Sequence, residues 1–366
     1  MNCSLRQLLR LASPRTLRYR LLTFPVLPPP SVPLARRLLI ALIAGILTTV
    51  FAYHQLIGRG ALASDFQYDL RAAERLLQGL DPYNDPTTRY GLPYPFDAQF
   101  PYPLFAAMLA VPFTPFPDYL AGALYVGCLA TLMAFAVTRD GVWRLVIFLS
   151  PSYFVTASVA NWSPLLIAAA FLPTLYPLAI VKPTLALPLM LNRPNWRGFL
   201  LCLPMVVFSF VLMPDWPWRW LSSVANQPSG KYLMPILFPP GLLLIATLLW
   251  WRRRSARLLF FFSLIPQHPF FYDQLLLWLI PQTVRQSLAL SGAGWLAYFG
   301  WFWLDGGDPL LALTPHGPSL HWIVPTFYMP ALCLVAWQQF VAYQEKRQAM
   351  QTMLVKQDEA AASVIS

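Results

Sequence analysis

The chain has 366 residues, of which 57% are hydrophobic and 11% are charged, and its formal net charge is +11 at pH 7. This composition, with a mean hydropathy of +0.51, excludes an ordinary soluble domain of this length and indicates a multi-pass membrane protein. Contact with anionic lipid explains the positive charge, so no nucleic-acid partner is expected.

The N-terminal region is strongly basic. Residues 1–37 contain seven Arg and no acid, whereas residues 58–103 contain six acids and four Arg. The positive-inside rule therefore places the N-terminus in the cytoplasm and the acidic stretch outside. We expect a basic cytoplasmic tail at 1–33, a membrane domain at 34–343, and a first outer loop at 58–101 that begins after the first span.

Apolar segments recur throughout 34–343 and predict an all-α bundle with about nine to eleven membrane segments. The polar, Ala-rich stretch 344–366 is expected to be a cytoplasmic tail that frays, because Lys346 and Arg347 mark the inner face. Many of the 37 prolines lie at the ends of apolar segments. Proline frees backbone groups that must be satisfied elsewhere, so a kinked bundle around a cavity is plausible.

A short amphipathic helix is predicted in the first outer loop. Ser64 and Gln67 have the spacing of a capping box, and Gly79 followed by Pro82 indicates where the helix ends. Apolar and charged residues alternate at helical spacing between these signals. We therefore expect this helix to lie on the membrane surface.

Two carboxylates on this helix are the first candidates for chemistry. Asp65 and Asp69 are four residues apart, so they share one helix face. Asp65 could simply complement the helix N-terminus, or it could act on a substrate. Tyr83 and Tyr102 follow in the same acidic, aromatic region, where aromatic residues either anchor at the membrane interface or stack on sugar.

Several short motifs resemble glycosyltransferase family 87, the polyprenyl-phosphate-mannose-dependent mannosyltransferases of the GT-C superfamily. These motifs, in chain order, are Asp65-Phe66, Ala72-Ala73, Gly79, Asp81-Pro82-Tyr83, Tyr102-Pro103-Leu104 and Lys182-Pro183. The chain departs from the family pattern at Leu104, where the family has a second Pro. It departs again at Asn161-Trp162-Ser163-Pro164, where a Gly-Gln-x-Asn-like motif is usual.

This resemblance implies a GT-C-type bundle in the cell membrane, with its active site at the outer face and both termini in the cytoplasm. It implies transfer of a hexose, most simply mannose, from a polyprenyl-phosphate donor to a lipid or glycan acceptor, with Asp65 as the general base. The expected donor-phosphate contacts are Lys182, His268 and Arg71, and the expected acceptor or sugar contacts are Asp69, Tyr83 and Tyr102.

Other interpretations stay open at this stage. Lys182 lies in a long apolar stretch, where it is either functional or extends to the membrane surface. No cofactor is certain and no metal-binding motif is found, although a divalent cation could meet the phosphate charge. Trp216, Trp218 and Trp220 suit an aromatic belt at the interface.

The rival functions are a transporter or flippase of lipid-linked sugar, with charges in mid-membrane on broken helices, and a non-catalytic membrane subunit.

Overall fold

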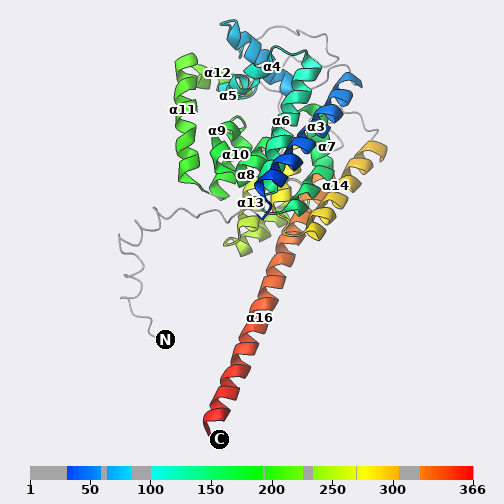
Figure 1. The fold of residues 1–366 in the computed structure, drawn as a ribbon, viewed down its shortest axis with the longest axis vertical. Coiled ribbons are helices and arrows are strands. Elements are labelled where there is room, and N and C mark those ends of the chain that lie inside the picture. The colour runs from blue at the N-terminus through cyan, green and yellow to red at the C-terminus, as the bar shows by residue number, and fades with distance from the viewer. Residues whose placement is uncertain are drawn as a thin grey trace.

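The computed structural model describes residues 31–58, 64–84, 100–192, 194–225, 234–268, 270–304 and 322–365. The regular elements in these ranges are helices, which confirms the all-α prediction for this part of the chain. Figure 1 shows most helices gathered into one body, from which a single long helix projects. Most of the tail expected at 1–33, and 59–63 and 85–99 of the first loop, lie outside the described residues.

Two long apolar helices, α3 (Leu34–Gly58) and α6 (Asp118–Val137), pack side by side. Arg37 in the first turn of α3 donates from Nη2 to the carbonyl of Phe135, near the end of α6, at 2.6 Å. Its guanidinium also lies 4.0 Å from the centre of the Phe135 ring. The beginning of α3 therefore meets the end of α6, and the two helices run antiparallel.

The crossing of α3 and α6 depends on two glycines. A Cβ added to Gly45 would lie 1.9 Å from the Thr131 hydroxyl, and one added to Gly127 would lie 1.9 Å from the Thr49 hydroxyl. Both threonines donate to the carbonyl of the glycine one turn earlier in their own helix, at 2.9 Å. The pair thus has a small residue and a hydroxyl on each side, as helices that approach closely within membranes often do.

The described residues contain two helices that are long and apolar enough to cross a membrane, α3 and α6. The number rises to four if each bent pair is one span: η2 (Val142–Leu149, a 3₁₀ helix) with α7 (Pro151–Val159), bent by 67°, and α11 (Trp196–Leu212) with α12 (Trp216–Ala225), bent by 89°. This is fewer than the nine to eleven segments predicted.

Proline explains much of the difference, because its ring removes a backbone donor and clashes with the preceding turn. Apolar runs that the sequence suggested as spans are divided into short helices. In the first half of the chain these are α5 (Leu104–Ala110), η1 (Val111–Phe113), α8 (Ser163–Phe171), η3 (Pro173–Leu175), α9 (Tyr176–Ala179) and α10 (Pro183–Asn192). In the second half they are η4 (Pro235–Leu237), η5 (Gly241–Trp250), α13 (Arg254–Ser263) and η6 (Asp273–Leu279).

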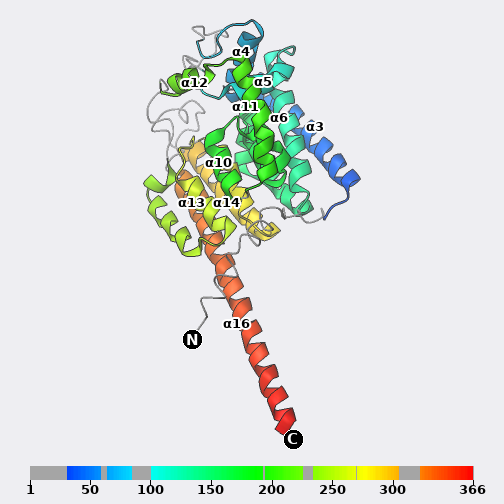
Figure 2. The same ribbon diagram turned by 90° about the vertical axis from the view of Figure 1, so that its left-hand side faces the viewer.

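The chain ends in α14 (Val284–Leu304), the π-helical segment η8 (Val324–Tyr328) and α16 (Met329–Ile365). The Gln338 amide holds the first part of α16 to the body by donating to the Ile280 carbonyl and to Gln286 Oε1, both at 3.0 Å. Figure 2 shows the rest of α16 projecting away from the body. The tail predicted to fray is helical in the described residues.

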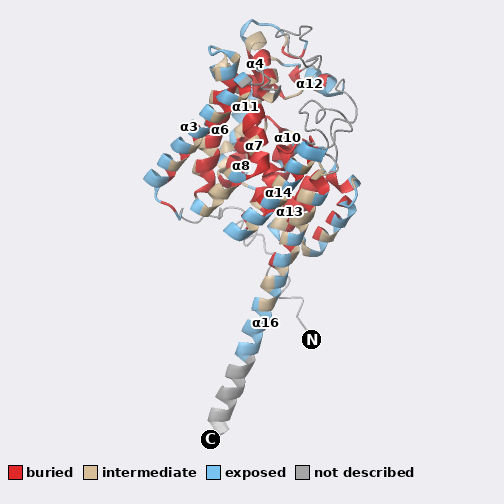
Figure 3. Ribbon diagram, turned by 90° about the vertical axis from the view of Figure 1, so that its right-hand side faces the viewer, coloured by how far each residue is buried: buried red, intermediate tan, exposed pale blue. Residues whose placement is uncertain are grey.

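Helix α4 (Ser64–Leu77) begins at the predicted residue, and Gly79 with φ of +70° follows its end. Its first half is part of the core, however, and does not lie on a surface as predicted. Phe66 is fully buried and stacks on Tyr125 of α6, with ring centres 4.1 Å apart. The Gln67 side chain is buried and has no hydrogen-bond partner in the described part of the chain, so it forms no capping box. Figure 3 shows buried residues running from α4 through the centre of the body.

Helix α4 lies at one end of the body, and Arg37 and Arg139 lie at the other. In Figure 1, α4, α5 and α12 are at one end, and α16 leaves from the other. The beginning of α3, with Arg37, meets the end of α6, and the Arg139 carbonyl directly after α6 accepts a 3.0 Å bond from the Ser31 backbone N–H. Leu56, in the last turn of α3, packs in the same core as Phe66 of α4.

We predict that Gly127→Leu destabilises the fold, whereas Gly292→Leu does not. Leu at Gly127 must displace Thr49 and the Gly45 carbonyl, which would lie 3.1 Å from its Cβ, and such overpacking costs about 1 to 3 kcal/mol. Gly292 lies on α14 with no atom within 4 Å of an added Cβ, so it is the matched control. The thermal midpoint of unfolding in detergent measures both, and equal midpoints would contradict the crossing.

Candidate active site

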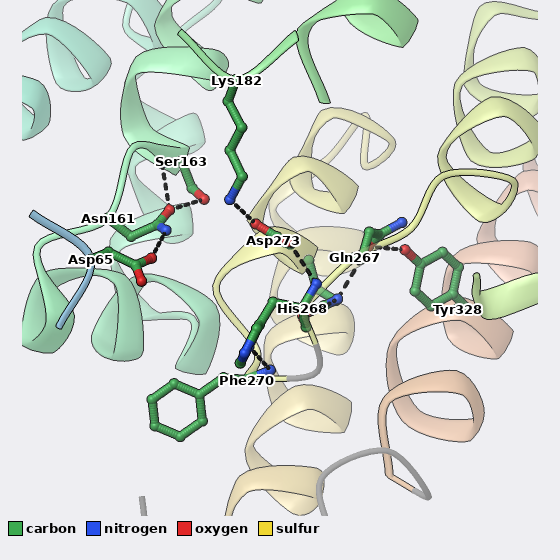
Figure 4. A network of polar contacts seen from close by, with 10 residues as sticks. Asp65, Asn161, Ser163, Lys182, Gln267, His268, Phe270, Asp273 and Tyr328 are labelled. Carbon is green, nitrogen blue, oxygen red and sulfur yellow. Dashed lines mark hydrogen bonds and ion pairs between the residues drawn. The ribbon is translucent and has the colours of Figure 1, made fainter. Parts of the chain in front are cut away.

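Asp65 lies half-buried in the first turn of α4. Asn161 donates from Nδ2 to Asp65 Oδ2, and this bond joins α4 to the turn between α7 and α8 (Figure 4). A neutral amide holds a carboxylate in place and does not neutralise its charge. The half-buried Asp65 carboxylate is thus oriented by Asn161, and an oriented carboxylate is one requirement of a general base.

Asn161 is oriented by its own neighbours. Helix α7 ends at Val159, and the left-handed backbone of Ala160 (φ of 50°) turns the chain into Asn161. The Asn161 Oδ1 atom then accepts hydrogen bonds from the backbone N–H of Ser163 at 2.9 Å and from its hydroxyl at 2.6 Å. Because two donors occupy Oδ1, the amide must present Nδ2 to Asp65. Asn161, held in this way by the turn, thus supplies the partner of the predicted base.

Asp69 lies one turn further along α4 and is fully buried. Neither of its carboxylate oxygens has a hydrogen-bond partner in the described residues. Burial raises the pKa of Asp69 well above its usual value, and the charge of Asp65 adds to the effect, while the Trp162 indole and the charge of Lys182 act in the opposite direction. Asp69 therefore holds a proton more strongly than an ordinary aspartate does.

Lys182 directly precedes α10 and forms a buried ion pair. Its ammonium lies 2.7 Å from Asp273 Oδ1, and both side chains are at least nine-tenths buried. Asp273 Oδ2 accepts the backbone N–H of His268 at 2.9 Å, so one carboxylate holds both predicted phosphate contacts (Figure 4). The ammonium also lies 5.2 Å from the centre of the Tyr272 ring. Lys182 is thus held in the interior and does not extend to a surface.

The turn that carries His268 is tightly constrained. His268 Nδ1 accepts the backbone N–H of Phe270 at 3.3 Å, so the neutral ring carries its proton on Nε2. The ring stacks on Tyr272, with centres 5.3 Å apart. Phe271 is fully buried with a positive φ of 67°, a conformation that costs energy for a bulky residue. The strain is located at the turn that connects His268 with Asp273.

The turn is also held by side-chain bonds from Gln267 to η6, η8 and α13. Gln267 Oε1 accepts a hydrogen bond from Gln274 Nε2 at 3.1 Å and another from the Tyr328 hydroxyl of η8, as Figure 4 shows for Tyr328. The Gln267 amide donates to the Phe262 carbonyl at the end of α13. His268 is therefore presented by a turn that three elements hold in position.

Of the remaining predicted contacts, Arg71 lies on the same helix as Asp65 and Asp69, and Tyr83 contacts Tyr102. Arg71 is buried, and its charge acts on Tyr68 of the same helix. Tyr83 is buried, and its hydroxyl donates to the carbonyl of Tyr102 at 3.2 Å. Burial, followed by the charge of Asp81, raises the pKa of Tyr83. The described contacts bring Tyr83 and Tyr102 together, and they place neither residue against Asp65.

A second group of charges surrounds this tyrosine pair. Asp81 accepts the backbone N–H of Tyr83 at 2.9 Å, and its other oxygen accepts Arg219 Nη1 from α12. Arg219 also pairs with Asp215 at 2.6 Å. We call residues 81–84 and 100–102 the rim, because α12 holds both segments together.

Sequence reasoning assigned no role to Asn161 or Asp273, although they are the direct partners of Asp65 and Lys182. Asn161 stood out only as a departure from a motif, and Asp273 only as a neighbour of His268 in the sequence. No group of three or more His, Cys, Asp or Glu residues that could hold a metal ion occurs among the described residues.

We predict that Asp69→Asn stabilises the protein, by an amount that grows as the pH rises. The pKa of Asp69 is raised in the folded state. The free energy of unfolding of the parent therefore falls once the pH passes the unfolded-state pKa near 4, by up to about 1.4 kcal/mol per pH unit. Thermal midpoints of parent and variant measured from about pH 5 to about pH 8 test this. A difference between them that does not change with pH would contradict it.

We also predict that Lys182→Met destabilises the protein and that Asp273→Asn in the same chain restores much of the loss. The single variant leaves the buried Asp273 carboxylate without its cation, at a cost of about 3 to 5 kcal/mol. Asn at 273 removes that charge and can still accept the His268 N–H. Double-mutant cycles of unfolding in one detergent provide the measurement, and additive effects would show that the pair is not coupled.

Comparison with protein-family models, with curated proteins and with solved structures finds no match for this chain. The site brings together a half-buried carboxylate, a buried carboxyl group, an ammonium held by Asp273 and a constrained His268 turn. Such a set can accept a proton at Asp65 and offer cationic and N–H donors to an anion beside it.

Proposed function

We propose that the protein is a membrane glycosyltransferase. It moves a hexose, most simply mannose, from a polyprenyl-phosphate donor to a lipid or glycan acceptor, at the outer face of the cell membrane. The observation that carries the proposal is the placement of two carboxyl groups in different environments, Asp65 oriented and half-buried, and Asp69 buried with a raised pKa. Environments that separate the pKa values of neighbouring acids are typical of catalytic sites.

In the proposed reaction the acceptor oxygen attacks the anomeric carbon of the donor sugar. The bond from that carbon to the phosphate oxygen breaks, and polyprenyl phosphate leaves with the electron pair. Asp65 takes the acceptor proton, and Asn161 holds the carboxylate during this step. Lys182 has three N–H donors, of which the bond to Asp273 uses one. The others, with His268 Nε2–H, can meet the charge on the leaving phosphate.

The orientation in the membrane follows from the same proposal. Arg37 and Arg139 lie at the end of the α3–α6 pair that is remote from α4, and the positive-inside rule assigns that end to the cytoplasm. Helix α4 and the rim then face outward, where a lipid-linked sugar donor is used. The donor and the acceptor are the partners that this arrangement requires.

A second candidate is a transporter or flippase of lipid-linked sugar. Buried charges on interrupted helices are characteristic of transporters. The observation that favours it is the buried Lys182–Asp273 pair, whose members precede α10 and begin η6 at breaks between short helices. A flippase moves its lipid and makes no new glycosidic bond, so product analysis separates the two candidates.

We predict that Asp65→Asn abolishes sugar transfer and that Asp69→Asn costs much less. Asn at 65 keeps the size of the side chain and can still accept the Asn161 amide, so the fold should survive. General-base assistance of roughly 10²- to 10⁴-fold would be lost. The assay follows label from polyprenyl-phosphate-mannose into candidate acceptors with purified protein.

Comparison of Asp65→Asn with Asp69→Asn decides which residue is the base. If Asp65→Asn transfers sugar at the parent rate while Asp69→Asn is inactive, the base is assigned wrongly. If both variants keep parent activity, α4 is not the catalytic element. Lipid movement across reconstituted vesicles without transfer would favour the flippase.

A further inference from the structure

Helix α12 has two faces with different surroundings. Trp216, Trp220 and Ser223 point toward the body, and Trp216 and Ser223 are buried. Trp218, Leu221 and Val224 recur at helical spacing on another side and are 72%, 50% and 43% exposed. Of the three tryptophans expected to form an aromatic belt, only Trp218 is strongly exposed, whereas Trp216 and Trp220 face the body.

The corner between α11 and α12 is rigidly fixed. The Trp216 indole donates to the Ser209 hydroxyl of α11 at 3.1 Å, and its ring lies 5.2 Å from Phe105 of α5. The Trp220 indole donates to the Pro101 carbonyl at 3.0 Å, and the Ser223 hydroxyl donates to the Phe100 carbonyl at 2.6 Å. These bonds hold α12 at 89° to α11.

The exposed side of helix α11, next to this corner, is apolar. Leu203, Val207 and Val211 form an apolar row that is 56%, 61% and 72% exposed. A row of this kind along an apolar helix fits the acyl chains of a bilayer, and α11 with α12 is long and apolar enough to form one bent membrane segment. If α11 follows the membrane normal, the 89° bend places α12 parallel to the membrane plane.

We propose that the Trp218–Leu221–Val224 face of α12 is seated in the bilayer at the boundary between headgroups and acyl chains. Tryptophan and aliphatic side chains on one side of a short helix suit this boundary. Arg219, with Asp215 and Asp81 around it, lies on another flank and remains in water. Three side chains are too few for a stable protein partner, which needs about 800 Å² on each side.

Contact of α12 with the bilayer also affects the position of the rim. Helix α12 bonds to the carbonyls of Phe100 and Pro101 and, through Arg219, to Asp81. The lipid surface therefore determines the height of the rim above the membrane. The inference concerns lipid contact only and does not depend on the proposed glycosyl transfer.

The test places a nitroxide on single cysteines in the full-length chain after its four native cysteines have been replaced. Leu221→Cys and Val224→Cys probe the proposed lipid face. Ser222→Cys is the matched control, since it is exposed, adjacent in sequence and on the side of α12 toward Arg219. Power-saturation EPR in phosphatidylcholine and phosphatidylglycerol vesicles compares collision with oxygen and with a water-soluble nickel chelate.

We expect oxygen to dominate at 221 and 224 and the nickel chelate to dominate at 222. Dominance of the nickel chelate at all three positions would overturn the proposal, because the face would then lie in water. Spin–spin broadening at 221 that disappears on dilution with unlabelled protein would also overturn it, since a second copy would then cover the face. Elution of each variant at the parent position in size-exclusion chromatography controls for folding.

Discussion

Ionised groups inside an apolar helical body need partners, and this constraint determines where the polar side chains lie. Lys182 is stabilised by Asp273, which also accepts a backbone N–H from the His268 turn. Asp65 is held by Asn161, whose own oxygen is satisfied by Ser163. Asp69 is fully buried, and burial, followed by the charge of Asp65, raises its pKa well above the usual value.

The polar residues of the site lie where helices are interrupted. Asn161 lies in the turn between α7 and α8, Lys182 directly before α10, and Asp273 at the beginning of η6. Interrupted helices expose backbone groups and provide irregular segments inside the body, which a set of continuous spans would not do. The same prolines that reduce the number of long helices thus create the positions at which charges can be placed.

The two ends of the molecule differ in charge and in construction. At one end Arg37 supports the crossing of α3 and α6 through the Phe135 carbonyl. At the other end α12 bends over the rim, and Arg219 joins Asp81 to Asp215. The first half of α4 is buried in the core, and Arg75 near its end donates to the Asp81 and Asn84 carbonyls, so α4 connects the core with the rim.

Local chemistry let the sequence predict some features correctly. It determined the helical class and the end of α4 before Gly79, because glycine preferences act over a few residues. The start of α4 at Ser64 was also predicted correctly, although the capping box expected there does not form. Only the tertiary structure decided that α4 is buried and that the apolar runs make two to four candidate spans. It also decided the partners of Asp65 and Lys182, which lie 96 and 91 residues away along the chain. Contacts over such separations depend on how helices pack, and no local spacing in the sequence encodes them.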